Sequence, residues 1–278
     1  MNTDKLFEQI RQKKSFLCVG LDPDINKLPV HLKNSKLPVF EFNKQIIDAT
    51  AKYSIAYKPN LAFYEFRGLT GWQELEQTVI YIRQKYPEIF LIADAKRGDI
   101  GNTSKMYADA FFKNMDFDAI TVAPYMGEDS IKPFLEYPGK FAIILALTSN
   151  DSAADFQYFT SKANKPLFME VLEKSKTWGT SENMMYVVGA TKADMLVKFR
   201  ELLPDHFLLV PGIGAQGGSL EEVAKYGLNK KCGLLVNASR SIIYAGNDLD
   251  FTNKAAIEAG NLQKEMELLL KKASIINY

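Results

Sequence analysis

The sequence predicts a closed (β/α)8 barrel, a single domain over residues 1–278, and two patterns support this. First, eight short apolar runs recur along the chain, and each is continuous rather than alternating, as in strands buried on both faces. Second, stretches with helical spacing of apolar residues separate these runs. Eight strand–helix units in fewer than 300 residues favour a closed parallel barrel, and a doubly wound open sheet is the alternative.

The predicted elements follow one another in a regular order. The strands are FLCVGL (16–21), SIAYKP (54–59), FLIADA (90–95), AITVAP (119–124), AIILAL (142–147), MMYVVG (184–189), FLLVPG (207–212) and CGLLVN (232–237). The clearest helices are 37–53, 72–86, 191–203 and 219–227. The last begins with Ser219 as its N-cap and ends at Gly227. Two long connections, 22–37 and 149–165, follow strands on the side where barrels place their active sites.

Composition excludes several classes of protein. Lys and Arg number 34 against 33 Asp and Glu, so no excess charge favours nucleic acid or an anionic membrane surface. No apolar run approaches the roughly 20 residues of a spanning helix, and charges interrupt the N-terminal stretch where a signal peptide is apolar. Two separated cysteines, Cys18 and Cys232, lie in apolar runs and predict buried reduced thiols in a cytoplasmic protein.

Only two histidines occur, His31 and His206, and both lie in loop-like stretches near a proline. This predicts a surface position for each and excludes a zinc site built from several histidines. No serine-nucleophile elbow and no H-E-x-x-H motif occurs either. The chemistry must therefore depend on lysines, carboxylates and backbone groups.

Charged side chains end three neighbouring strands. In LIADAKRGDIGNT (91–103), Asp94 and Lys96 are two residues apart, so they share one face of the strand. Lys58 ends the second strand and Asp22 ends the first. Each charge alone could cap its strand and pair with a neighbour. Four together at the carboxyl ends of barrel strands predict an active site.

Glycines at the end of the seventh strand predict a phosphate site. Residues 212–217 match the dinucleotide fingerprint G-x-G-x-x-G formally, but they follow the seventh strand rather than the first. Their amides, together with NASRS (237–241) after the eighth strand, instead match the usual anion site of phosphate-binding barrels. Arg240 would add a bidentate partner. The sequence thus implies a substrate with one phosphate.

The motif D-A-K-R-G-D-I-x-x-T, from Asp94 to Thr103, resembles the D-x-K-x-x-D signature of orotidine 5'-phosphate decarboxylases. The resemblance extends over LDPD, YKPN, LTSN, PGIGAQGG and ASRS at the ends of other strands. The chain length and the forms YKPN and LTSN are similar to those of the longer branch of the family, found in some bacteria and in malaria parasites. Related sugar-phosphate barrels share the signature but hold a metal with an acidic residue at the second strand, where this chain has Lys58.

The resemblance implies decarboxylation of orotidine 5'-phosphate to UMP and CO2 without metal or organic cofactor. Lys96 would stabilise the carbanion at C6 and protonate it, and Asp94 would lie against the departing carboxylate. Lys58 and Asp99 would complete an alternating array of charges. Two alternatives stay open: a metal-dependent sugar-phosphate lyase or decarboxylase of the same superfamily, and a non-catalytic barrel that binds a phosphate ligand.

The resemblance also implies a set of substrate-binding residues and a partner. Asp22, Asn60 and Thr103 would bind the ribose or position neighbours, Ser149 (or else Thr148 or Ser152) would contact the pyrimidine, Gln216 and Arg240 would hold the phosphate, and Pro211 would also line the site. In the family the second aspartate reaches into the neighbouring subunit. We therefore expect a homodimer in which Asp99, beyond the end of its strand, serves the partner's site.

Overall fold

The computed structural model describes residues 1–161, 164–213 and 217–277. All eight predicted strands are present, and each pairs in parallel with the next until β8 closes on β1. The strands are β1 (Leu17–Gly20), β2 (Ala56–Lys58), β3 (Phe90–Arg97), β4 (Ala119–Val122), β5 (Phe141–Leu147), β6 (Met184–Val188), β7 (Leu208–Pro211) and β8 (Leu234–Ala238). The closed barrel confirms the predicted fold class.

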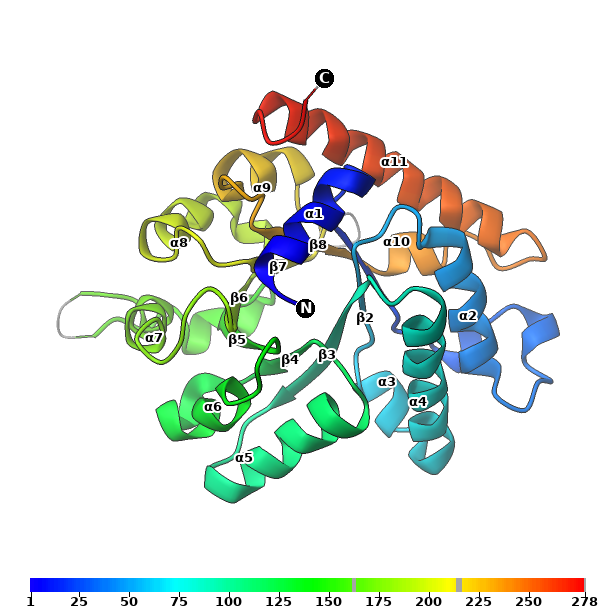
Figure 1. Cartoon of the computed structure of the whole chain (residues 1–278), viewed down its shortest axis with the longest axis horizontal. Coiled ribbons are helices and arrows are strands. Elements are labelled where there is room, and N and C mark those ends of the chain that lie inside the picture. Colours follow the sequence, from blue (N-terminus) through cyan, green and yellow to red (C-terminus); the bar gives the residue numbers. More distant parts are fainter. Residues whose placement is uncertain (162–163, 214–216, 278) are drawn as a thin grey trace.

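The helices surround the barrel as an outer ring, except α1, which crosses one end of the barrel (Figure 1). They are α1 (Thr3–Lys13), α2 (Pro38–Thr50), α3 (Ala62–Glu65), α4 (Gly68–Lys85), α5 (Gly101–Ala108), α6 (Glu128–Leu135), α7 (Leu167–Ser175), α8 (Leu196–Leu202), α9 (Leu220–Gly227), α10 (Arg240–Ile243) and α11 (Phe251–Lys272). The helix predicted over 191–203 is divided: a 3₁₀ segment with a non-helical backbone at Lys192 precedes α8. The two long connections contain further short 3₁₀ turns.

Local sequence signals account for the helix ends. Ser219 caps α9 as predicted, because its hydroxyl accepts the N–H of Glu222 at 3.2 Å. Asn2 does the same for α1 by accepting the N–H of Lys5 at 2.9 Å. Leu6 and Ile10 of α1 are fully buried, and the helix crosses the end of the barrel where the strands begin (Figure 1). The opposite end, where the strands finish, carries the predicted site residues.

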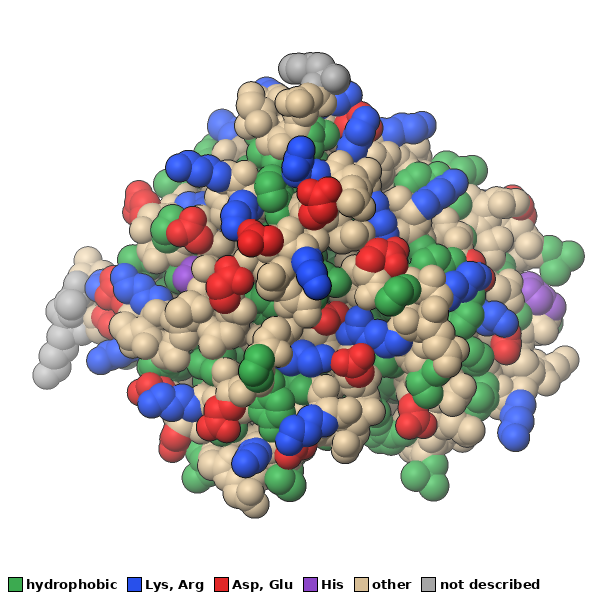
Figure 2. Space-filling model, viewed as in Figure 1, with side chains coloured by type: hydrophobic (Ala, Val, Ile, Leu, Met, Phe, Trp, Pro, Cys, Tyr) green, Lys and Arg blue, Asp and Glu red, His purple; other side chains and the backbone are tan. Residues whose placement is uncertain are grey.

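The strands are buried on both faces, which explains their continuous apolar sequences. Their side chains form one connected hydrophobic core with the inward faces of the helices. Cys18 and Cys232 belong to this core as free thiols, as predicted. The face that carries α1 mixes positive and negative side chains (Figure 2). In the described part of the chain, no helix is both long and apolar enough to span a membrane.

His206 departs from its predicted surface position. Both ring nitrogens are buried and have no hydrogen-bond partner among the described residues, and the ring packs edge-on against Tyr186. Burial, with help from the nearby Arg200, lowers the pKa of His206 to about 4. The surface prediction was wrong because a polar loop can still fold over a ring that packs against a core tyrosine. His31 is exposed, as predicted.

Candidate active site

Two lysines flank one aspartate where β2 and β3 end. Lys58 Nζ lies 2.7 Å from Asp94 Oδ2, and Lys96 Nζ lies 2.5 Å from Asp94 Oδ1. The Lys58 side chain is almost completely buried, whereas that of Lys96 is 51% exposed. The structure thus brings together three of the charges that the strand ends predicted, in the order Lys–Asp–Lys.

Lys58 and Asp94 keep each other charged. Burial by itself would lower the pKa of Lys58, but the carboxylates of Asp94 and Asp22 outweigh burial and raise that pKa. Burial would likewise raise the pKa of Asp94, but Lys58 and then Lys96 outweigh it and hold that pKa well below its usual range. Near neutral pH the site therefore presents a carboxylate between two ammonium groups.

Lys96 lies in an irregular part of β3. Ala93 pairs with Ile120 and Arg97 pairs with Val122, so four steps along β3 match two along β4. This bulge places Lys96 in a left-handed backbone conformation with φ of 49°. Side-chain alternation predicts the proximity of Asp94 and Lys96 correctly, but the bulge is what sets their geometry.

Asp22 lies at the end of β1 and is held from two sides. One carboxylate oxygen accepts the backbone N–H of Asn60 at 3.0 Å, and the other accepts the hydroxyl of Ser239 at 2.8 Å. Ser239 approaches β1 so closely that a Cβ on Gly20 would lie 2.6 Å from its own Cβ. Only glycine fits at that position, and the contact joins the first and last strands beneath the site.

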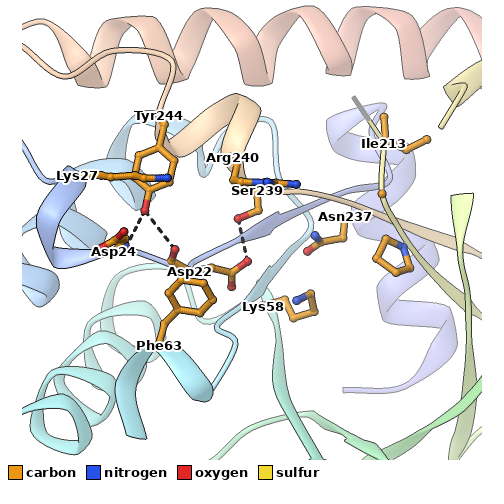
Figure 3. Close-up of a pocket in the computed structure, with 12 residues that line it drawn as sticks. Asp22, Asp24, Lys27, Lys58, Phe63, Ile213, Asn237, Ser239, Arg240 and Tyr244 are labelled. Carbon is orange, nitrogen blue, oxygen red and sulfur yellow. Dashed lines mark hydrogen bonds between the residues drawn. The ribbon is translucent and has the colours of Figure 1, made fainter. Parts of the chain in front are cut away.

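A pocket of about 500 Å³ opens beside Asp22 and Lys58 (Figure 3). Of the predicted residues, it is lined by Asp22, Lys58, Pro211 and Arg240. Sequence reasoning missed several others, which are Asp24, Lys27, Phe63, Asn237, Ser239 and Tyr244. Position alone signals four of them, because Asp24 and Lys27 lie in the long 22–37 connection and Asn237 and Ser239 lie in the predicted anion segment.

Tyr244, at the end of α10, contacts the segment that follows β1. Its hydroxyl accepts the backbone N–H of Asp24 at 2.6 Å, and Lys27 Nζ lies 5.4 Å from the centre of its ring. Figure 3 shows these groups on one side of the pocket, with Arg240 nearby at the start of α10. Arg240 is exposed and has no polar partner among the described residues, so it is available to an anion.

The predicted phosphate loop begins at the end of β7. Gly212 has φ of 104°, a conformation suited to glycine, and its carbonyl accepts the N–H of Gly218 at 3.2 Å. Gly212 and Ile213 both line the pocket. Gln216, the predicted phosphate ligand of this loop, lies outside the described residues.

Asp94 and Lys96 lie next to Lys58 rather than in the lining of the pocket, and four other predicted residues do not line the pocket of their own chain either. Asp99 follows β3, and its carboxylate accepts the N–H of Ile100 at 2.7 Å, with no lysine partner among the described residues. Thr103 is exposed in the first turn of α5. Asn60 lies behind Lys58, where its side chain accepts the N–H of Ala62 at 3.2 Å. Ser149 lines a separate cavity of about 550 Å³ after β5.

Comparisons with known proteins show the family of the chain. The family model described as "Orotidine 5'-phosphate decarboxylase / HUMPS family" matches residues 15–254. The orotidine 5'-phosphate decarboxylase of Flavobacterium johnsoniae is 60% identical over 96% of this chain and 97% of its own. The structure of Leishmania donovani UMP synthase is 37% identical with a TM-score of 0.80, over 94% of this chain and 56% of that one. A putative orotidine-monophosphate-decarboxylase of Plasmodium yoelii shares the fold, with a TM-score of 0.87 at 24% identity over 97% and 99% of the chains. The chain therefore belongs to the orotidine 5'-phosphate decarboxylase / HUMPS family.

Proposed function

We propose that this protein decarboxylates orotidine 5'-phosphate to UMP and CO2, the last step of de novo UMP synthesis. The observation that carries this is the Lys58–Asp94–Lys96 array next to a pocket that Arg240 also lines. Relatives named orotidine 5'-phosphate decarboxylase, which match nearly the whole chain at 58–60% identity, support the proposal. The array supplies fixed charges at a reaction centre, and the pocket supplies room for a nucleotide with its phosphate.

The chemistry needs an ammonium beside the reacting carbon. When the bond from C6 to the carboxylate breaks, its electron pair stays on C6, where no adjacent carbonyl can accept it. Lys96 stabilises this charge and then donates a proton from Nζ to C6, while CO2 leaves near Asp94. Lys58 keeps Asp94 ionised and holds it in place. Because these charges are fixed before the reaction, they need little reorganisation as the bond breaks.

The rest of the substrate supplies binding energy far from C6. We propose that Asp22 and Asn60 bind the ribose, Pro211 and Ser149 contact the pyrimidine, and Arg240 and Gln216 hold the phosphate. Such remote contacts can contribute to transition-state stabilisation, because the reacting carbon itself offers few groups to bind. The pocket location of Asp22, Pro211 and Arg240 supports their part of this assignment.

We propose further that the protein is a homodimer in which Asp99 and Thr103 serve the partner's site. Large apolar side chains are exposed on the segments that follow β2, β3, β4 and β5, at the same end of the barrel as the site. They are Phe66, Leu69, Ile100, Met106, Tyr125, Met126, Phe156 and Phe159. Exposed apolar side chains on neighbouring segments favour a protein partner, and Asp99 and Thr103 lie on the β3 segment.

A subunit-mixing experiment tests the shared site. Lys96→Ala and Asp99→Ala homodimers should each be nearly inactive. In a mixed dimer with Asp99 acting across the interface, one site collects both substitutions and the other collects neither. Random reassortment then restores roughly a quarter of wild-type activity, since half the dimers are mixed and each has one intact site. A mixture of Lys96→Ala with Asp94→Ala is the control, because these residues meet within one chain and no site is repaired. Full subunit exchange without recovery would contradict the proposal.

The two alternative functions make different predictions in one assay. A metal-dependent lyase of the same superfamily needs an acidic ligand at β2, but that position holds the buried ammonium of Lys58. In the described part of the chain, no three His, Cys, Asp or Glu side chains are grouped to hold a metal. Purified protein should therefore consume orotidine 5'-phosphate, followed by its ultraviolet absorbance, at the same rate in excess EDTA. Inhibition by EDTA would favour the lyase, and no turnover at all would favour a non-catalytic barrel.

We also propose that residues 1–278 act as one barrel domain and that the protein is cytoplasmic. The continuous core supports the first. The two free, buried cysteines support the second, because thiols stay reduced in that compartment. Fractionation of cells that carry a tagged chain would check the location.

A further inference from the structure

Thr121 of β4 touches both residues that surround the reaction centre. Its hydroxyl oxygen accepts the backbone N–H of Lys96 at 2.9 Å and lies 3.1 Å from Asp94 Oδ1. We propose that Thr121 is a positioning residue of the decarboxylation, one that orients Lys96 and Asp94 without touching substrate. The inference rests on the proposed function, since it concerns the step that those two residues carry out.

The donors and acceptors that each group carries determine the direction of both hydrogen bonds. A threonine hydroxyl has one proton to donate and lone pairs to accept. The Lys96 N–H can only donate, so the Thr121 oxygen accepts there. Its own proton is then available to Asp94, which as a carboxylate can only accept. The hydroxyl therefore bridges a backbone donor and a charged acceptor in one fixed arrangement.

The bulge in β3 explains why a side chain is needed here. Phe90 and Asp94 of β3 donate their N–H groups to carbonyls on the β2 side, so a regular strand would turn the Lys96 N–H the same way. The register shift between Ala93 and Arg97 turns it towards β4 instead. Lys96 also has a left-handed backbone, which is unfavourable for a residue with a side chain. The Thr121 hydroxyl replaces the missing acceptor and so holds the bulge that aims the lysine.

The second contact matters during the reaction itself. Asp94 Oδ2 faces Lys58, while Oδ1 is shared by Lys96 Nζ and Thr121. As Lys96 donates its proton to C6, its ammonium charge is lost and its hold on Oδ1 weakens. The Thr121 hydroxyl continues to donate its hydrogen bond to Oδ1, so the carboxylate keeps its orientation through the proton transfer.

Packing alone does not require a threonine at this position. Thr121 is 1% exposed, and its neighbours in β4 are the apolar Ile120 and Val122. Valine has nearly the same shape and would fill the same space without a polar atom to satisfy. The hydroxyl, rather than the volume, is what the site uses.

Three substitutions separate the hydroxyl from the packing. Thr121→Val keeps the shape and removes the hydroxyl, while Thr121→Ser and Thr121→Ala differ from each other only in the hydroxyl. We expect Thr121→Val and Thr121→Ala to lower kcat by about 10- to 100-fold, because small displacements of reacting groups cost factors of this size. The KM for orotidine 5'-phosphate and the Kd of UMP should change by less than about threefold, since binding rests on remote contacts. Thr121→Ser should stay within about threefold of wild-type kcat, because it keeps the donor and the acceptor.

A threonine outside the site provides the control. Thr50 is fully buried near the far end of α2, where its hydroxyl contacts Ile46 O at 2.7 Å and Tyr57 Oη at 2.8 Å. Thr50→Val should lower stability but leave kcat unchanged. If Thr121→Val does not fold, the Ser and Ala pair still decides the matter. Equal kcat in that pair, or a Thr121→Val loss confined to KM, would overturn the proposal. An inactive wild type would instead refute the proposed function, and this inference with it.

Discussion

Lys58 and Lys96 flank the same carboxylate, yet replacing them should affect stability very differently. The Lys58 side chain is 5% exposed, and the Asp94 side chain that it contacts is 12% exposed. Lys58→Ala leaves that carboxylate buried with Lys96 as its one charged partner among the described residues, and breaking a buried pair typically costs about 3–5 kcal/mol. Since Lys96 still contacts Asp94, we expect the lower end, about 3 kcal/mol. Lys96 is half exposed, so Lys96→Ala should cost about 0–1 kcal/mol, as for surface ion pairs.

Both substitutions should nevertheless abolish activity, Lys96→Ala because the proton donor is gone and Lys58→Ala because Asp94 is misplaced. Urea denaturation at pH 7 without ligand, paired with the absorbance assay, measures the two properties separately. A double substitution, Lys58→Met with Asp94→Asn, should recover stability but not activity, because it leaves no unpaired buried charge. Similar stability losses for the two lysines would refute this reasoning. So would a Lys96→Ala enzyme with more than about a tenth of wild-type kcat, which corresponds to only about 1.4 kcal/mol of barrier.

Three further predictions concern the phosphate and pH. Arg240→Ala should reduce kcat/KM for orotidine 5'-phosphate by about 2–3 kcal/mol, the scale of a charged hydrogen bond, and scarcely affect phosphate-free orotidine. Equal losses on both substrates would place the phosphate elsewhere. Because His206 has a pKa of about 4 in the folded state and about 6.5 when unfolded, its contribution to stability is complete above pH 6.5. It falls by about 3 kcal/mol as the pH drops towards 4. His206→Phe should remove that part of the acid sensitivity in urea titrations, and an unchanged pH dependence would contradict the burial argument. Because the pKa of Asp94 is depressed, kcat should show no titration of this carboxylate above about pH 4, and an apparent acidic pKa near 6 would disagree.

The barrel could be predicted from the sequence because its signals are local. A strand buried on both faces is apolar along most of its length, so each of the eight strands appears in the sequence as a continuous run. The same holds for the cap at Ser219, which depends on residues within one helical turn. Lys58, Asp94 and Lys96 could be placed together because all end barrel strands, and those ends meet at one edge.

The tertiary structure alone decided contacts between residues distant in the sequence. Ser239 hydrogen-bonds Asp22, which is 217 residues away in the sequence, and Thr121 hydrogen-bonds Lys96, which is 25 residues away. Nothing local in AITVAP distinguishes Thr121 from a neutral strand residue, because its role arises only when a bulge on the neighbouring strand leaves an N–H unpaired. The buried ring nitrogens of His206 were missed for the same reason, since the ring packs against Tyr186 of β6. Periodicity therefore determined which elements form and which ends carry charge, whereas the register between strands determined how those charges are aimed.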